Sequence, residues 1–281
     1  MLKKKQVAKI DKVLELLRKE KVDTWFDLGL FLDRLKDKNS KSGFSQDSKA
    51  FNKHLNKGGV AFISFFFTID GVTVEAEKYA KTFKNIYPNI PIHYIAGEIK
   101  PEADEIIPND AFKKTIKEMD GFDNWPLYDD FFNVKMEKGS DAYNVLITKF
   151  WDEVLVLVEK LGRYIEESNI SLLYLINVCS NPRNVSLALA SVLISEYLGI
   201  PVINNNHDFY WESGNREIER KIKGLKKGAR DLFFCNSHIG EFFSLIETIY
   251  PWESRSWINV NINRLQTVSY THLTLPTTPY V

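Results

Sequence analysis

Short apolar segments at a regular spacing constrain the fold of this chain most. Runs rich in Leu, Ile and Val begin 30 residues apart, at Leu172, Val202 and Leu232. A strand, a crossover helix and a return loop occupy roughly 30 residues, and strands that are apolar on both faces are typical of parallel sheets covered by helices. The sequence therefore predicts an α/β fold with an open parallel, Rossmann-like sheet and helices on both faces.

The same alternation of apolar strands and amphipathic helices runs through most of the chain. Val60–Phe67 is the first continuous apolar run, and Ser140 and Gly199 are the expected cap and stop of two long helices. Strands are expected at residues 60–67, 91–96, 105–108, 172–177, 202–206, 232–235 and 257–260, and helices at 74–85, 111–119, 141–167, 184–198 and 239–249.

Two terminal segments differ from this α/β region, which we place at residues 58–266. Residues 1–57 carry apolar side chains at helical spacing, with Asp23 as the expected cap of a second helix, and are predicted to form a helical N-terminal extension. Residues 267–281 contain no Lys, Arg, Asp or Glu and resemble translated sequencing-adapter read-through. We therefore expect this tail to be non-native and the natural chain to continue beyond about Gln266.

Composition excludes several functional classes. The 281 residues include 37 Lys and Arg against 37 Asp and Glu, so no net charge attracts nucleic acid, which we do not expect as a partner. Only two cysteines occur, which favours a reducing compartment. No uncharged apolar run reaches the ~18 residues of a membrane span. We expect a cytoplasmic protein.

Function is expected in the loops that follow the strands, because ligands of open parallel sheets bind at the carboxyl ends of the strands. The sequence lacks the dinucleotide-binding pattern GxGxxG, the P-loop, the zinc patterns HExxH and CxxC, and the nucleophile elbow GxSxG. The sequence thus gives little support to a dehydrogenase or a P-loop NTPase, and no metal site is expected.

Two of these loops carry suggestive residues. After the first strand, Gly71 opens a helix, where backbone N–H groups can approach a phosphate, although simple backbone geometry is the commoner reason for such a glycine. In the loop after residue 177, Asn184 is the expected cap of the next helix. Asn181 and Arg183 are not required to cap this helix, and their side chains can hydrogen-bond a polyhydroxylated or anionic ligand.

The strand that begins at Val202 ends in the most informative cluster. Its three asparagines, Asn204–Asn206, are followed by His207, Asp208 and aromatic residues that include Trp211. A structural role needs only one or two such groups, because unsatisfied buried amides are costly, and histidine can act as a base, a donor or a ligand. We interpret the cluster as a functional site; a loop histidine beside core aromatics is the alternative.

These residues are similar to a known family. The apolar first strand, the Asp70-Gly71-Val72 turn and the later strand that ends in His207-Asp208 resemble the N-terminal domain of family 4-like glycosyltransferases with the GT-B fold. The runs Pro201–Glu212 and Tyr250–Asn263 look like a bacterial subgroup of that family. The resemblance covers about residues 58–266 and implies the N-terminal half of a GT-B fold.

The resemblance implies a specific activity. Such enzymes transfer a sugar from a nucleotide-sugar co-substrate to a hydroxyl acceptor, here with retention and without a metal or a cofactor. Gly71 would lie near the donor diphosphate, and His207 and Asp208 would be catalytic. The acceptor side would be lined by Asp70, Asn181, Arg183, Asn184, Asn206 and Trp211. A sugar, a lipid-linked or a small-molecule hydroxyl acceptor fits, so a peripheral contact at the inner membrane face is compatible with the resemblance.

The resemblance also has a limit. The carboxylate-rich donor motif of the family, E-x7-E, belongs to a second domain that this chain does not include. We therefore expect the chain alone to be an inactive fragment, because transfer needs donor and acceptor held in attack geometry. Two alternatives stay open: a sugar-nucleotide epimerase of the same double-Rossmann architecture, and a non-enzymatic sugar- or nucleotide-binding α/β domain.

Overall fold

The structure is a computed structural model and describes residues 8–41, 47–209, 235–236 and 238–264. Within these residues, six parallel strands form one sheet in the order β5-β3-β1-β6-β7-β8. They are β1 (Val60–Ile63), β3 (Ile92–Ala96), β5 (Phe112–Thr115), β6 (Leu172–Ile176), β7 (Val202–Asn206) and β8 (Trp257–Asn261). Counted along the chain, this order is third, second, first, fourth, fifth, sixth, as in doubly wound α/β folds. The predicted open parallel sheet is confirmed.

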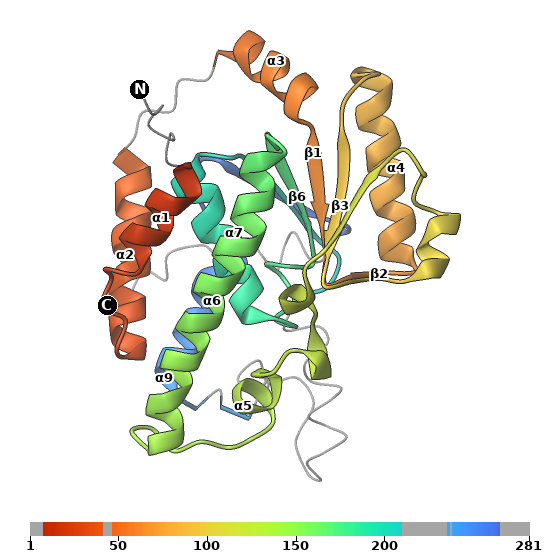
Figure 1. Cartoon of the computed structure of the whole chain (residues 1–281). Helices are drawn as coiled ribbons and strands as arrows, with labels where there is room; N and C mark the ends of the chain where they lie inside the picture. Colours follow the sequence, from red (N-terminus) through yellow and green to blue (C-terminus); the bar gives the residue numbers. More distant parts are fainter. Residues whose placement is uncertain (1–7, 42–46, 210–234, 237, 265–281) are drawn as a thin grey trace, which may run out of the picture.

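Helices cover both faces of the sheet (Figure 1). The side chains of α4 (Gly71–Ile86) pack on one face, together with Leu55 of α3 (Ser48–Gly58). The other face is covered by α1 (Lys9–Leu17), α2 (Trp25–Lys41), α6 (Asp141–Glu167), α7 (Val185–Leu198) and α9 (Gly240–Ile249). Within this layer α7 is apolar all round and is buried by α6 and the sheet, as expected of a helix without a polar face.

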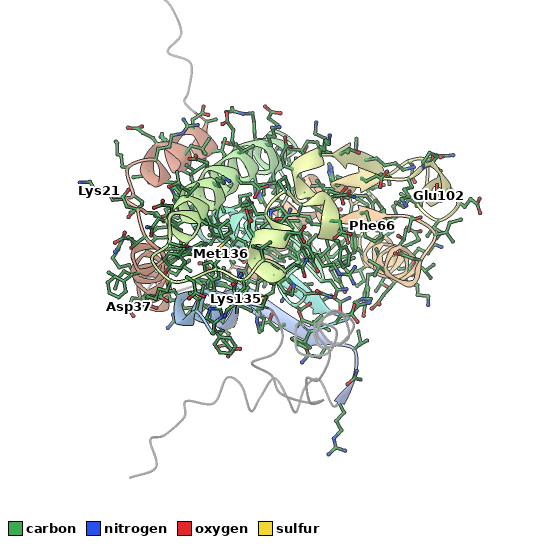
Figure 2. The ribbon with its side chains drawn as sticks, turned by 90° about the horizontal axis from the view of Figure 1, so that it is seen from below. Lys21, Asp37, Phe66, Glu102, Lys135 and Met136 are labelled. Carbon is green, nitrogen blue, oxygen red and sulfur yellow. The ribbon has the colours of Figure 1, made fainter. Side chains whose placement is uncertain are left out.

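The centre of the sheet is fully buried. Ile63, the last residue of β1, pairs with Ile95 of β3 on one side and with Leu175 of β6 on the other. Because all six strands are parallel, their carboxyl ends meet at one edge. Figure 2 views the molecule from below, the side toward which β1 runs in Figure 1, with Phe66 near the sheet and Glu102 toward the outside.

Short elements surround this edge. The strands β2 (Phe66–Phe67) and β4 (Glu98–Ile99) form a separate parallel pair just beyond β1 and β3. The 3₁₀ helices η1 (Pro101–Glu105), η2 (Lys117–Met119) and η3 (Phe122–Asn124) and the short helix α5 (Tyr128–Phe132) follow before α6. They bring the segment around residue 122 to the loop that follows β6, since the Phe122 N–H donates to the Arg183 carbonyl at 2.9 Å.

The N-terminal helices share the core of the α/β region. Both Glu166 carboxylate oxygens on α6 accept hydrogen bonds from the first turn of α1, from the Lys9 N–H at 2.7 Å and the Ile10 N–H at 2.9 Å. An anion at a helix N-terminus is favourable because it satisfies N–H groups that lack intrahelical partners. Trp25 of α2 is likewise buried, with its ring 4.5 Å from that of Phe242 on α9.

Several predicted elements are confirmed. The long helix begins after Ser140, whose hydroxyl accepts from the Tyr143 N–H, and spans the predicted residues 141–167. The helix after Asn184 ends at Gly199, which adopts the left-handed conformation at φ 68° that glycine allows. Leu172 and Val202, which were predicted to begin strands 30 residues apart, are the first residues of β6 and β7, and these two strands are adjacent in the sheet.

Other predictions about elements are wrong. Residues 111–119 form the edge strand β5 and η2 rather than a helix, and the strand expected at 105–108 is absent. Strand pairing between residues 112–115 and β3 outweighs the local sequence pattern that predicted a helix. Phe112 of β5 also stacks on His93 of β3, with ring centroids 4.7 Å apart. The cap of α2 is Thr24 and not Asp23, because the Thr24 hydroxyl accepts from the Asp27 N–H at 3.1 Å.

Some predictions fall outside the described residues. They include the tail 267–281 and all of the expected strand 232–235 except Cys235, whose backbone N–H donates to the Phe132 carbonyl. In the sheet, β7 pairs directly with β8. No helix among the described residues has the length and the apolar character needed to span a membrane.

Candidate functional site

The strand order locates the expected site. In a doubly wound sheet, the loops diverge to opposite faces at the switch point, here between β1 and β6, and ligands bind in the crevice outside the carboxyl ends of those strands. The loop after β1 leads into α4, and the loop after β6 leads into α7. The end of β7 lies beside β6 and brings a third segment to this place. We use the word crevice for the region bordered by the carboxyl ends of β1 and β6, the start of α4 and the end of β7.

The first contributor is the start of α4. Asp70 is its N-cap, and the carboxylate accepts from the Thr73 N–H at 2.8 Å, so it has a structural role. Gly71 follows and is exposed. A methyl group on Gly71 would meet no described atom within 4 Å, and the residue does not adopt a left-handed backbone conformation. Neither packing nor backbone strain therefore requires glycine at this open helix N-terminus.

Asn177, the residue after β6, organises the end of β7. Its side-chain oxygen accepts from the backbone N–H groups of His207, at 2.8 Å, and Asp208, at 3.0 Å. Its amide nitrogen donates to Asp208 Oδ2 at 3.2 Å. Asn177 is buried and has φ 64°, a left-handed conformation that asparagine adopts more readily than most residues. One buried side chain thus holds both predicted catalytic residues.

His207 faces α4. Its Nε2 lies 2.7 Å from Glu75 Oε2, with the two side chains 13% and 26% exposed. Asn205, which is fully buried, donates from Nδ2 to Glu75 Oε1 at 3.3 Å, and the same Nδ2 lies 3.3 Å from His207 Nε2. The structure therefore joins His207 and Asn205 to a carboxylate that belongs to the second turn of α4.

Asp208 and Arg183 form the other side of the cluster. Arg183 Nη2 lies 4.0 Å from Asp208 Oδ2, and the guanidinium carbon lies 3.7 Å from the centroid of the Phe122 ring. The Phe122 backbone is itself in the left-handed region at φ 57°. A guanidinium over an aromatic face is held in orientation by cation–π attraction. Arg183 and Asp208 thus bring opposite charges from two loops to one place.

The structure separates the remaining predicted residues of the loop after β6. Asn181 is 6% exposed and its carbonyl accepts from the Arg183 N–H at 2.8 Å. Asn184 is fully buried: Oδ1 caps α7 through the Leu187 N–H, and Nδ2 donates to the carbonyls of Glu118 and Asp120. These contacts give Asn184 a structural role, so we do not retain it as an acceptor-binding residue.

Asn206 is also part of the packing. Parallel strands place alternate residues on opposite faces, so Asn204 and Asn206 point away from Asn205. Asn204 Nδ2 donates to Asn206 Oδ1 at 2.9 Å and to Asn259 Oδ1 at 2.9 Å, and Asn206 Nδ2 donates to Asn261 Oδ1 at 3.0 Å. These four residues, which we call the amide ladder, largely satisfy one another. Asn204 and Asn206 therefore belong to the packing between β7 and β8, whereas Asn205 faces α4.

Sequence reasoning missed two residues of the cluster. Glu75 lies one helical turn after Gly71, so a carboxylate at this spacing was a readable signal that the side chain shares a face with the start of α4. Asn177 was placed at the end of a strand, and nothing in the sequence distinguishes it from other polar turn residues. Trp211, expected on the acceptor side, lies outside the described residues.

Two further residues of chemically reactive types lie elsewhere. Cys179 is fully buried, and burial raises the pKa of its thiol, as for a small packing residue. His238 contacts the carbonyls of Cys235 and Met136, away from the cluster. The described side chains contain no group of three or more His, Cys, Asp or Glu residues that could hold a metal ion.

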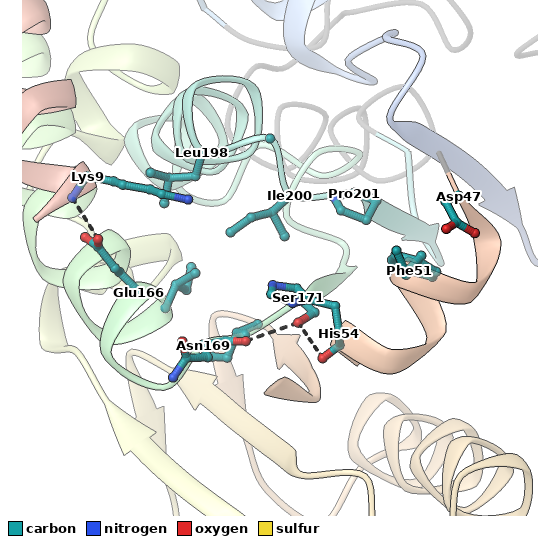
Figure 3. Close-up of a pocket in the computed structure, with 14 residues that line it drawn as sticks. Lys9, Asp47, Phe51, His54, Glu166, Asn169, Ser171, Leu198, Ile200 and Pro201 are labelled. Carbon is teal, nitrogen blue, oxygen red and sulfur yellow. Dashed lines mark hydrogen bonds between the residues drawn. The ribbon is translucent and has the colours of Figure 1, made fainter. Parts of the chain in front are cut away.

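A cavity of about 610 Å³ lies at the opposite edge of the sheet (Figure 3). Ser171 and Pro201, which precede β6 and β7, line it together with Phe51, His54 and Glu166. The Ser171 hydroxyl is directed to the carbonyls of His54 and Asn169, each at 3.1 Å. The cavity thus lies at the amino ends of the strands, and none of the predicted site residues lines it.

Comparison with known proteins adds little to this geometry. No family model matches the chain, and no curated protein matches it. The chain is similar to the crystal structure of Glycyrrhiza uralensis UGT73P12 complexed with glycyrrhetinic acid 3-O-monoglucuronide, with 11% identity and a TM-score of 0.35. The match covers 76% of this chain and 46% of that one, so this chain spans about half the length of its structural neighbour. A likeness this distant carries no argument, and function is inferred from the site itself.

Proposed function

We propose that this chain is the acceptor-side half of a GT-B type glycosyltransferase similar to family 4. It would help to transfer a sugar from a nucleotide-sugar to a hydroxyl acceptor, with retention and without a metal. The observation that carries the proposal is the grouping of His207 and Asp208, held by Asn177, at the switch point that also presents the open start of α4. The sequence resemblance and the geometry both support a site in this crevice.

Each residue would have a distinct role. The N–H groups at the start of α4, near Gly71, would bind the donor diphosphate and stabilise the charge that develops as the sugar leaves. His207 would orient the donor sugar by hydrogen bonding. Asp208 and Arg183, whose charges face each other across 4.0 Å, would bind acceptor hydroxyls or an acidic acceptor group. The second domain of the family would supply the nucleotide site.

The test uses a protein extended beyond Gln266 to include that second domain. It is assayed with UDP- and GDP-hexoses and octyl glycosides as acceptors, and product mass and nucleoside diphosphate release are measured. We expect His207→Ala to lower turnover about 100-fold while the unfolding free energy changes by less than about 1 kcal/mol. His54→Ala, an exposed histidine of α3, is the matched control and should leave turnover unchanged.

Four results would contradict the proposal. Full turnover by His207→Ala would remove His207 from the site. An epimerised nucleotide-sugar as the product would favour the epimerase alternative, and binding of nucleotide-sugars without any product would favour a non-enzymatic domain. Transfer by residues 1–266 alone at the rate of the extended protein would refute the division of the substrates between two domains.

A further inference from the structure

We infer that Glu75 is a positioning residue that fixes the imidazole of His207 in the crevice, with Asn205 fixing Glu75 in turn. This inference rests on the proposed function of His207. It concerns a helix residue four positions after Gly71 to which neither the predicted site nor the family resemblance assigns a role.

The geometry uses both oxygens of the Glu75 carboxylate. Oε2 accepts from His207 Nε2, 2.7 Å away, and Oε1 accepts from Asn205 Nδ2 at 3.3 Å. In this arrangement Nε2 carries the proton. Asn205 is a fully buried strand residue whose backbone carbonyl also accepts from the Asn177 N–H at 3.1 Å, so its own position is fixed by the sheet.

The pair differs from the ion pairs on the surface. The Lys19–Glu15 pair has both side chains 68% exposed, whereas His207 and Glu75 are 13% and 26% exposed. Exposed pairs contribute little because water and side-chain entropy compete with them, while a partly buried pair is screened less. The Glu75–His207 contact also joins α4 to the end of β7, two elements that border the same crevice.

Holding the ring has a functional consequence. A histidine that orients a sugar must present the same nitrogen in the same direction in each molecule, and a displacement of about 1 Å can reduce turnover roughly 100-fold. Asn177 fixes the backbone of His207 by accepting a hydrogen bond from the His207 N–H, and Glu75 fixes the ring through its contact with Nε2. Together the two contacts define the orientation of the side chain.

The first test is made on this chain without substrate. The imidazole ¹H–¹⁵N resonances are recorded, and His207→Gln identifies the signal of His207 among the five histidines. We expect a slowly exchanging Nε2–H in the wild type, its loss in Glu75→Ala, and partial recovery in Glu75→Gln, which keeps an acceptor oxygen. Glu98→Ala removes an exposed carboxylate from β4 and should leave the signal unchanged.

The second test measures turnover of the extended protein. Glu75→Ala should lower kcat roughly 10- to 100-fold with KM for the donor nearly unchanged, and Glu75→Gln should recover part of the loss. Loss of turnover with an intact Nε2–H resonance would mean that Glu75 contacts substrate directly, which overturns a positioning role. A wild-type His207 without the slowly exchanging Nε2–H, or one unaffected by Glu75→Ala, also overturns it. The resonance decides the inference even if the extended protein transfers no sugar.

Discussion

The two faces of β7 use the same residue type in opposite ways. On the face toward α7 and α9, Asn204 and Asn206 pair with Asn259 and Asn261 of β8 and form the amide ladder. On the face toward α4, Asn205 holds the carboxylate that contacts His207, at the border of the crevice. Both faces bury their amides completely, but only one directs them to charged and titratable groups.

This difference shows what a cluster of asparagines can and cannot indicate. The cost of an unsatisfied buried amide predicts that each one has a partner, yet the partner can be another amide. Two in-register strands with asparagine at paired positions satisfy most of their own hydrogen bonds, although the buried Asn204 Oδ1 has no partner among the described residues. A site is indicated only where the amide contacts a group such as Glu75 that is itself partly exposed.

The largest expected effect concerns the amide ladder. Asn204→Asp replaces a fully buried donor with an anion that faces the acceptor oxygens of Asn206 and Asn259, so we expect a loss of roughly 3 to 5 kcal/mol in unfolding free energy at pH 7. Denaturant unfolding measures it. Asn144→Asp, an exposed position in the first turn of α6, should change stability by less than about 0.5 kcal/mol. Equal effects would mean that the ladder is not a packing feature.

A second prediction concerns a histidine that belongs to the packing and not to the crevice. Burial lowers the pKa of His93 to about 4, and its Nδ1 lies 3.0 Å from the Tyr164 hydroxyl. The unfolded chain binds a proton near pH 6.5 while the folded chain does not, so stability should fall as pH drops from about 6.5 to about 4, by about 3 kcal/mol from this group.

Unfolding free energies of the wild type and of His93→Gln, measured across that pH range, test this prediction. The difference between the two should change with pH, because the variant lacks the titrating ring. His54→Gln, which removes an exposed histidine, should follow the wild-type curve. Parallel curves for His93→Gln and the wild type would show that His93 is protonated in the folded state as readily as in the unfolded one.

The smallest expected effect on stability is at Gly71. Gly71→Ala should change unfolding free energy by no more than about 1 kcal/mol, in favour of alanine, since the methyl group meets no described atom within 4 Å. Turnover of the extended protein should nevertheless fall about tenfold if the donor diphosphate approaches this backbone. Gly240→Ala is a matched control, because Gly240 also begins a helix and has no described atom within 4 Å of the added methyl group. Equal turnover for both variants would place the diphosphate elsewhere.

Much of the fold could be predicted because its signals are local. Apolar runs predicted β1, β3 and β6, and the 30-residue spacing of strand starts predicted β7. Ser140, Asn184 and Gly199 marked helix ends by their own hydrogen bonds or backbone conformation. The edge strand β5 could not be predicted in this way. Its four residues are exposed and contain two lysines, so neither burial nor alternation indicates a strand, and only pairing with β3 creates it.

The site could be predicted only in part, for a similar reason. The position of His207 and Asp208 at a strand end was visible in the sequence, but the partners Asn177 and Glu75 are 30 and more than 100 residues away along the chain. The division of Asn204, Asn205 and Asn206 between two faces followed from strand geometry, yet which face is the crevice depended on the position of α4.

The sequence by itself determined the class of fold and the edge of the sheet where function is expected, because apolar periodicity and the sense of parallel strands are properties of short segments. Only the tertiary structure decided which polar residues stabilise the fold and which border the crevice. Asn206 and Asn205 are neighbours in the chain, but one contacts Asn261 of β8 and the other contacts Glu75 of α4. Their roles differ because a polar group is defined by the partner that the fold brings to it.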